Sequence, residues 1–364
     1  MTDKPIFIAD GHLDLAFTAL HANRDLTQPA ATVRTHDSPK VMQTYGTSTT
    51  TFHELHKGHV GLVIATATAR LAPKDNWTRI GMYTQAQCYG VACSHAAYYH
   101  AMERERVIRI VRSVQDLNEV LANWEDPVPD TPIGLVLALE GCDPILGPDQ
   151  VPEWYDKGLR VASLSHYGVT SYAHGSGTEG GLLPPAKPLL DAFSEFGIIV
   201  DLSHLTDQSY WELLDIYDGP VLASHCNCRA LVPDQRQLSD DMLKAVIERG
   251  GVIGSAFDSW MLDTEWKHTA APYHQISNAT LETVADHIDH VCEVAGNARH
   301  AGLGTDVDAG FGTEQTPRDF NTSPDLQKFR GIFERRGYSE EDVRNILSGN
   351  WIRLLREVWG NRAS

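Results

Sequence analysis

The chain alternates between short apolar runs and longer amphipathic segments. Eight of the apolar runs, each four to seven residues long, predict strands that are buried on both faces. The predicted strands are Ile6–Asp10, Val60–Thr66, Ile133–Leu139, Val161–Ser165, Ile198–Leu202, Val221–Ser224, Val252–Ala256 and Ala301–Thr305.

Amphipathic segments with helix-start and helix-stop signals lie between these runs. Ser239 is suited to cap the start of one segment, and Gly250 and Gly296 are suited to end two of them. The predicted helices are Pro188–Phe196, Thr206–Tyr217, Ser239–Arg249 and Thr280–Ala295. Strands that alternate with helices predict a parallel sheet, and eight such strands predict a closed (β/α)8 TIM barrel of the α/β class.

Two segments interrupt the alternation. Residues 22–58 are polar and without a clear period, and residues 167–188 are rich in glycine and proline. Both follow predicted strands, so we expect long βα loops at the rim of the barrel. The tail Tyr338–Trp359 predicts one or two closing helices. We therefore expect one barrel domain over residues 1–364.

A His, Asp or Glu lies at the C-terminal end of several predicted strands. Parallel strands in a barrel end at one rim, so these side chains are expected to converge there. Five such junctions in one chain favour a bound metal. The segments are Asp10-Gly11-His12-Leu13-Asp14, Ala138-Leu139-Glu140-Gly141, Asp201-Leu202-Ser203-His204, Ala223-Ser224-His225 and Gly304-Thr305-Asp306.

The first junction offers an imidazole and a carboxylate, and the second offers a carboxylate alone. His12 and Asp14 are two residues apart, so in an extended strand they point the same way and can reach one metal. A polar surface turn is the alternative. Glu140 ends a nearly unbroken apolar strand, where a carboxylate is rarely left unpaired. It can bridge two cations, or it can be bonded to backbone or arginine.

Three histidines follow other strands. His204 and His225 can each ligate zinc or be hydrogen-bonded only, and their place on neighbouring predicted strands favours ligation. His166 is suited to be a ligand or a substrate contact. Ser224 lies beside a histidine, but no G-x-S-x-G motif supports a serine nucleophile.

Asp306 follows the last predicted strand. A carboxylate placed there, beside an activated water, can accept and return a proton. A helix N-cap is the other interpretation, and Asp308 competes with Asp306 for either role.

Composition narrows the class of protein. The 364 residues are 42% hydrophobic and 21% charged, as in a soluble globular protein. A formal net charge of −18 excludes a basic nucleic-acid footprint, and no apolar stretch reaches the length of a membrane span. No secretory signal is visible, and the six cysteines form no disulfide or zinc-finger spacing. We expect a cytoplasmic protein with free thiols and no membrane partner.

With these motifs in place, the chain resembles the membrane (renal-type) dipeptidase family, the M19 peptidases among the amidohydrolase-like barrels. The resemblance extends from Asp10 to about Leu355. Besides the five junctions, it includes Asn227-Cys228-Arg229-Ala230-Leu231-Val232 and Arg236-Gln237-Leu238-Ser239-Asp240. Leu13 and Tyr167 stand where family members commonly have Asn, and residues 22–58 are longer than expected.

The resemblance implies a binuclear zinc centre with two Zn²⁺ per subunit. His12, Asp14 and Glu140 would hold one ion. Glu140 would bridge to a second ion, held by His204 and His225.

The resemblance also implies roles for three residues outside the metal ligands. Asp306 matches the family's catalytic acid/base, and His166 matches a histidine that touches the scissile region. Arg236 matches an arginine that binds the substrate carboxylate, a task suited to a guanidinium fork. The family resemblance also implies a homodimer.

The hypothesis from sequence is hydrolysis of small dipeptides by a hydroxide that two metals activate. A related amidohydrolase that acts on N-acyl amino acids or lactones would use the same metals. The third alternative is a non-catalytic barrel that binds a ligand or partner.

Overall fold

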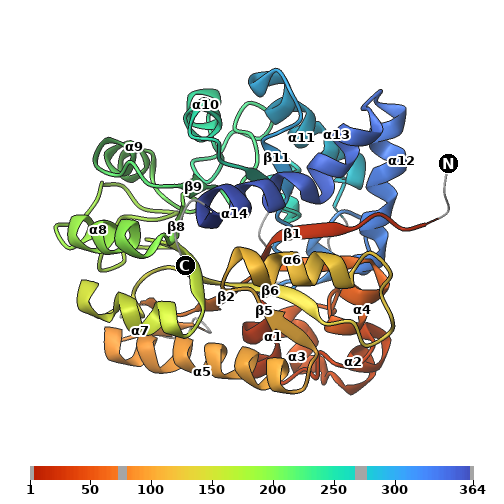
Figure 1. The fold of residues 1–364 in the computed structure, drawn as a ribbon, viewed down its shortest axis with the longest axis horizontal. Coiled ribbons are helices and arrows are strands. Elements are labelled where there is room, and N and C mark those ends of the chain that lie inside the picture. The colour runs from red at the N-terminus through yellow and green to blue at the C-terminus, as the bar shows by residue number, and fades with distance from the viewer. Residues whose placement is uncertain (1–3, 73–79, 267–276, 361–364) are drawn as a thin grey trace.

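The computed structural model describes residues 4–72, 80–266 and 277–360. Eight parallel strands form a barrel, with helices around it (Figure 1). The strands are β1 (Ile8–Leu13), β2 (Val60–Thr68), β6 (Ile133–Glu140), β7 (Leu159–Ser163), β8 (Ile199–Asp201), β9 (Val221–Leu222), β10 (Ile253–Ser255) and β11 (Ala301–Leu303). The predicted (β/α)8 barrel is confirmed, and each of the eight predicted strands overlaps one of these.

The strand order is β10-β11-β1-β2-β6-β7-β8-β9, and every pair in it is parallel. A single bridge between Ala223 and Ile253 joins the two ends of this order. The Ala223 N–H donates to the Val252 carbonyl at 2.9 Å, and the Gly254 N–H donates to the Ala223 carbonyl at 2.8 Å. The barrel therefore closes between β9 and β10 through very few hydrogen bonds.

Close backbone packing at this seam requires glycine. A Cβ atom on Gly254 or Gly304 would overlap the carbonyl oxygen of Ser224. Gly304 lies two residues before Asp306, so the close approach also sets where that carboxylate leaves the barrel.

The sequence analysis did not predict one strand, β5 (Ile108–Ile110). It pairs with the first half of β6, at Ile133–Leu135, whereas β7 pairs with the second half. Its three residues are too few to show a strand-like pattern of apolar residues in the sequence. Two short parallel strands, β3 (Arg70–Leu71) and β4 (Gly81–Met82), form a separate ribbon.

The helices agree with the capping signals. Ser239 caps α10 (Asp240–Glu248) through its side chain and Thr206 caps α9 (Asp207–Ile216), while Gly197 and Gly296 take left-handed backbone angles after α8 (Ala186–Phe196) and α11 (Leu281–Ala295). The other helices after the first long loop include α5 (Gln85–Arg104), α6 (Val114–Asn123), α7 (Val151–Asp156) and α12 (Lys328–Arg335).

Residues 22–58 contain more regular structure than the sequence suggested. After α1 (Leu15–His21), three short helices occupy this loop: α2 (Ala30–His36), α3 (Pro39–Tyr45) and α4 (Phe52–Lys57). Each has six or seven residues, too few for an amphipathic period to be recognised.

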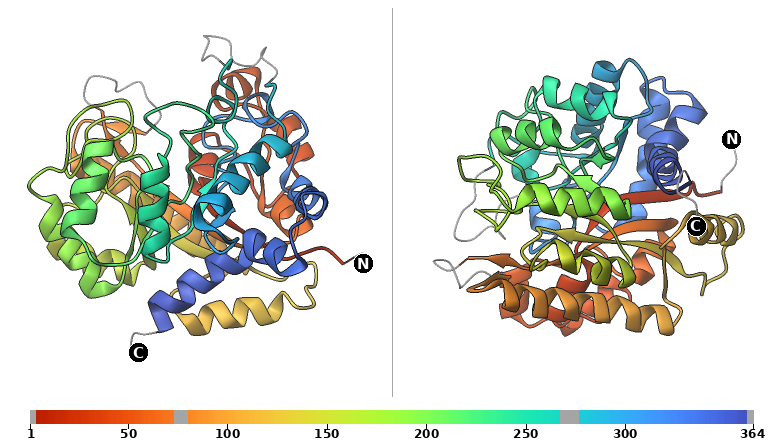
Figure 2. Two further views of the ribbon diagram at one scale, coloured as in Figure 1. Left: turned by 90° about the horizontal axis from the view of Figure 1, so that it is seen from above. Right: turned by 60° about the vertical axis from the view of Figure 1, so that its left-hand side comes forward.

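The tail forms α13 (Glu340–Arg344), one π-helical turn (Asn345–Gly349) and α14 (Asn350–Gly360). Trp351 is fully buried, and its indole N–H donates to the Leu303 carbonyl at 3.0 Å. Gly11 and Gly302 leave the room that this indole fills. The helix α14 also lies beside α6 (Figure 2, left). In the described residues, no helix combines the length and apolar character needed to cross a membrane.

We expect Gly304→Ala to lower the free energy of unfolding by about 1–3 kcal/mol, because the new methyl group must displace the Ser224 backbone. Chemical denaturation measures the change. Gly90→Ala in α5 is the control: its methyl group meets no atom within 4 Å, so it should stabilise by about 0.5–1 kcal/mol. Equal stability of Gly304→Ala and the native chain would contradict the close packing at the seam.

Candidate metal centre and active-site pocket

Strand register brings the candidate residues to one level of the barrel. Glu140, the last residue of β6, pairs with Ser163 of β7, which pairs with Asp201 of β8. His166 and His204 each lie three residues beyond these paired positions. The two imidazoles therefore leave neighbouring strands at the same distance beyond the paired residues.

The same spacing continues around the barrel. Asp201 pairs with Leu222, and His225 lies three residues beyond Leu222. Leu303 of β11 pairs with β1, and Asp306 again lies three residues further on. On each of these strands, the candidate side chain at the rim therefore lies three residues beyond a residue that is paired in the sheet.

The first strand differs from the expectation. β1 extends to Leu13, so His12 lies inside the strand and not after it. The ladder between β1 and β2 shifts register between Asp10 and Leu13, which changes the direction of the strand there. Asp14 follows directly, as the residue before α1.

Four imidazoles surround the carboxylate of Glu140. Its Oε1 lies 3.3 Å from Nε2 of His204, 3.5 Å from His225, 3.6 Å from His12 and 3.6 Å from His166. The Nε2 atoms of His204 and His225 are 2.9 Å apart. Apart from the partly exposed His166, all of these side chains are buried. These nitrogens converge on one carboxylate oxygen.

Besides His12, Asp201 and His225, the described residues contain two sets of possible ligand atoms at this centre. One set is Glu140, His204 and His225, and the other is His12, Asp14 and Asp306; within each set the atoms lie within 4.8 Å of one another. His12 Nε2 is also 3.7 Å from Asp306 Oδ1. The structure therefore places the Asp306 carboxylate with His12 and Asp14. It also lies next to Glu140, the predicted bridging ligand.

The residues fit divalent metal ions. Ligand atoms around a tetrahedral ion with bonds of about 2.0–2.2 Å are about 3.3–3.6 Å apart, close to most of the separations observed here. The Nε2 atom of His12 is buried and has no hydrogen-bond partner. A buried nitrogen in that state is explained by a ligand bond to a cation.

Burial disfavours every charge in the cluster. It lowers the pKa of His12 to about 3, and it lowers the pKa of His204 and His225 well below the usual value. Burial and the neighbouring carboxylates raise the pKa of Glu140 and Asp306 well above the usual range. Neutral imidazoles keep a lone pair for a metal, and a divalent cation would restore the ionised carboxylates.

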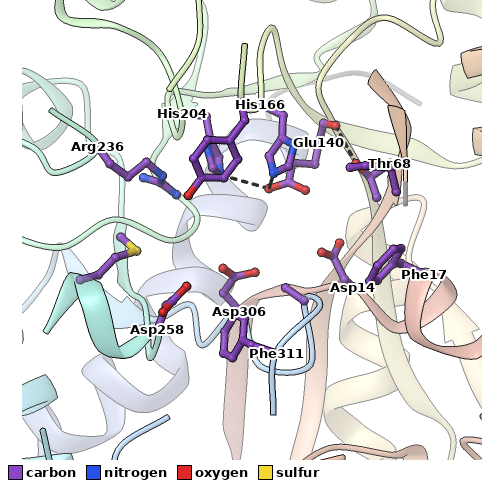
Figure 3. A pocket seen from close by; sticks show the side chains of 14 residues that line it. Asp14, Phe17, Thr68, Glu140, His166, His204, Arg236, Asp258, Asp306 and Phe311 are labelled. Atoms are coloured by element: carbon purple, nitrogen blue, oxygen red, sulfur yellow. Dashed lines mark hydrogen bonds and ion pairs between the residues drawn. The ribbon is translucent and has the colours of Figure 1, made fainter. Parts of the chain in front are cut away.

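A small cavity of about 130 Å³ opens onto this centre (Figure 3). Asp14, Glu140, Asp306 and His204 line it on the metal side. Its other walls are both apolar and charged: Phe17, Thr68, Ile80, His166, Tyr167, Arg236, Asp258, Met261, Ala309 and Phe311.

Arg236 lines this cavity although its side chain is buried. Its guanidinium donates to the His225 carbonyl at 2.8 Å and to the Cys226 sulfur at 3.1 Å, while its Nε has no partner. No carboxylate within the described ranges forms an ion pair with it. A buried cation in that state is suited to meet an anionic group of a ligand.

Comparison with known proteins identifies the family. A sequence profile of the membrane dipeptidases (peptidase family M19) matches residues 2–364. The chain belongs to the membrane dipeptidase family. The resemblance inferred from the motifs is confirmed.

Several curated relatives of this chain carry dipeptidase names. An uncharacterized dipeptidase of Schizosaccharomyces pombe is 30% identical over 232 residues, which cover 62% of this chain and 53% of the relative. Dipeptidase aclJ of Aspergillus oryzae is 31% identical over 231 residues, which cover 62% of this chain and 52% of the relative. The chain thus aligns with about half the length of these relatives.

Solved structures share the fold of this chain. A metallopeptidase called dipeptidase AC, of family M19, superposes with a TM-score of 0.78 at 22% identity, covering 98% of this chain and 100% of its own. A metallopeptidase from Rhodobacter sphaeroides, liganded with a phosphinate mimic of the dipeptide L-Ala-D-Ala, superposes with a TM-score of 0.77 at 21% identity. It covers 98% of this chain and 100% of its own.

One serine supports two of the candidate metal ligands. The Ser224 hydroxyl donates to Asp201 at 2.5 Å, and its oxygen lies 3.0 Å from Nδ1 of His12 and 2.7 Å from Nδ1 of His225. Because its only proton goes to Asp201, the oxygen accepts N–H bonds from both imidazoles. Each Nε2 is then left with a free lone pair.

A second serine supports the third imidazole. Ser176 Oγ lies 3.0 Å from Nδ1 of His204. His204 also has a φ of +68° and Asp306 one of +59°, strained conformations that the surrounding contacts must hold. The sequence analysis missed the support from Ser176, because 28 residues separate it from His204.

Asp308 has a structural role, whereas Asp306 faces the cavity. The Asp308 carboxylate accepts bonds from the backbone N–H groups of Thr49 and Thr50 and from the hydroxyls of Ser48 and Thr49. It therefore anchors the first long loop to the last strand. Of the two competing aspartates, only Asp306 has its carboxylate at the metal centre.

We expect Ser224→Ala to weaken metal binding by about 10–100-fold, because it frees the His12 and His225 rings together. Ser176→Ala frees only the His204 ring and should weaken metal binding less. Competition with a chromophoric chelator measures the metal affinity of each variant.

Ser163→Ala is the matched control, since among the described residues the hydroxyl of this buried serine bonds only to the backbone of Gly141 and Ser165. It should leave the metal affinity unchanged. Equal affinities in Ser224→Ala and the native chain would show that the serine does not orient the ligands.

Proposed function

We propose that this protein is a zinc-dependent dipeptidase with two metal ions per subunit. The observation that carries the proposal is the Glu140 carboxylate, buried among four imidazoles at 3.3–3.6 Å and opening onto a cavity with an unpaired arginine. The dipeptidase names of the relatives support it, as does the dipeptide mimic in the Rhodobacter sphaeroides structure.

His12, Asp14 and Glu140 would hold one zinc ion, and Glu140, His204 and His225 the other. Two zinc ions there would polarise the scissile carbonyl and make a water molecule nucleophilic near neutral pH. Imidazoles kept neutral by burial are suited to this task.

Asp306 would move the proton. Its side chain is 15% exposed, more than those of Glu140 and His12 at 4% and 2%, so it can reach both the attacking water and the substrate. It would take a proton from the water and deliver it to the amide nitrogen as the C–N bond breaks. The products are two free amino acids.

Arg236 and His166 would position the substrate. The guanidinium of Arg236 would hold the C-terminal carboxylate, which limits hydrolysis to the bond one residue from that end. His166, 3.6 Å from Glu140, would donate to the carbonyl oxygen as negative charge develops on it. The small cavity suits a dipeptide better than a long chain.

The proposal extends to location and assembly. The six cysteines are all free thiols, as expected in a reducing cytoplasm. The family resemblance supports a homodimer, and the net charge of −18 argues against a nucleic-acid partner.

We expect the purified chain to contain two zinc ions and to hydrolyse unblocked dipeptides. Chelation should abolish hydrolysis and added zinc should restore it, as elemental analysis and a dipeptide panel would record. Hydrolysis of N-acyl amino acids or lactones alone would identify the related amidohydrolase activity. A metal-loaded chain that hydrolyses none of these would be a non-catalytic barrel.

Asp306→Asn should lower kcat by about 10²–10⁴-fold while both metals remain bound, because an amide cannot accept the proton. Asp308→Asn is the comparison: it removes a carboxylate two residues away, and should lower the melting temperature by loosening residues 48–50. Near-native kcat in Asp306→Asn would exclude the proton-transfer role.

A further inference from the structure

Arg236 and Asp258 carry opposite charges and line the same side of the cavity, and neither forms an ion pair with another of the described residues. Arg236 and Asp258 both lie to the left of the metal centre in Figure 3. In the part of the chain that the structure describes, no carboxylate pairs with Arg236 and no basic nitrogen lies within 4 Å of the Asp258 carboxylate. The proposed mechanism uses the arginine and leaves the aspartate without a role.

Neutral donors hold the Asp258 side chain in place. Its carboxylate accepts from the Trp260 indole N–H and from the Gln315 amide, both at 2.8 Å. The residue is only 8% exposed, and burial raises the pKa of its carboxyl to about 7. These bonds fix the carboxylate against the cavity but do not neutralise its charge.

Asp258 is separate from the metal centre. It belongs to neither set of converging ligand atoms, and in Figure 3 Asp306 lies between it and Asp14. It therefore lies on the side of the cavity where Arg236 would hold the C-terminal residue of the substrate. Met261 and Phe311, which also line the cavity, offer apolar surface to an aliphatic chain.

We propose that Asp258 selects dipeptides whose C-terminal residue carries a cationic side chain, as lysine does. The inference rests on the proposed dipeptidase function and names its substrate class. The α-carboxylate would meet Arg236 while the side-chain ammonium meets Asp258, and the methylene stem would pack on Met261. A neutral side chain leaves the buried carboxylate uncompensated, and an acidic one is repelled.

The test compares Ala-Lys with Ala-Met, which has a neutral unbranched side chain, and with Ala-Glu. We expect kcat/KM of the zinc-loaded native enzyme to be at least about tenfold higher for Ala-Lys than for Ala-Met, and lowest for Ala-Glu. Asp258→Asn should bring the ratio of Ala-Lys to Ala-Met close to one.

Asp263→Asn is the matched control. This residue follows in the same segment, binds the N–H groups of Glu265 and Asn278, and does not line the cavity. It removes the same unit of charge and should leave the ratio unchanged. If both variants lower the ratio equally, the preference comes from the overall negative charge and the inference is overturned.

A second measurement does not depend on the variant folding. Free lysine should inhibit the native enzyme at least about tenfold more strongly than free methionine, because it is the product that fits both charges. Equal inhibition, or equal hydrolysis of Ala-Lys and Ala-Met, would overturn this inference and leave the dipeptidase function intact. Hydrolysis of none of the dipeptides would overturn the proposed function itself.

Discussion

The burial of the Glu140 carboxylate among four imidazoles is the constraint on which the rest of the site depends. Without a cation, a carboxylate in this position loses its hydration, so burial raises its pKa. The nearby Asp14 and Asp306 add repulsion. Such a cluster persists only if the scaffold offsets both the lost hydration and the repulsion between carboxylates.

The scaffold does this with parallel strands in fixed register. His166, His204, His225 and Asp306 each lie three residues beyond a paired residue, so a shift in one strand would displace a candidate side chain by several ångströms. Serines then fix the imidazole rings, and left-handed backbone at His204 and Asp306 turns the side chains inward. The stability of the barrel offsets this local strain.

The sequence predicts the barrel well because its strands are continuous apolar runs and its helices carry clear caps. It also places the polar residues of the rim, since each follows such a run directly. The short strand Ile108–Ile110 and the helices within residues 22–58 have too few residues to show a period. Ser176 and Asp258 escape prediction because their roles depend on tertiary contacts with distant residues, His204 and Gln315.

Charge also decides when the cavity can accept a substrate. Four carboxylates, Asp14, Glu140, Asp306 and Asp258, line it, and Arg236 is the one guanidinium among the described lining residues, so the metal-free cavity repels the C-terminal carboxylate of a peptide when these carboxyls are ionised. The positive charge of two divalent cations exceeds the negative charge of the three carboxylates that adjoin them. The net charge on the metal side of the cavity would therefore become positive. Asp258 lies apart from those ions and keeps its negative field at the far side. The proposed metals thus allow anionic binding, while Asp258 provides the discrimination between side chains.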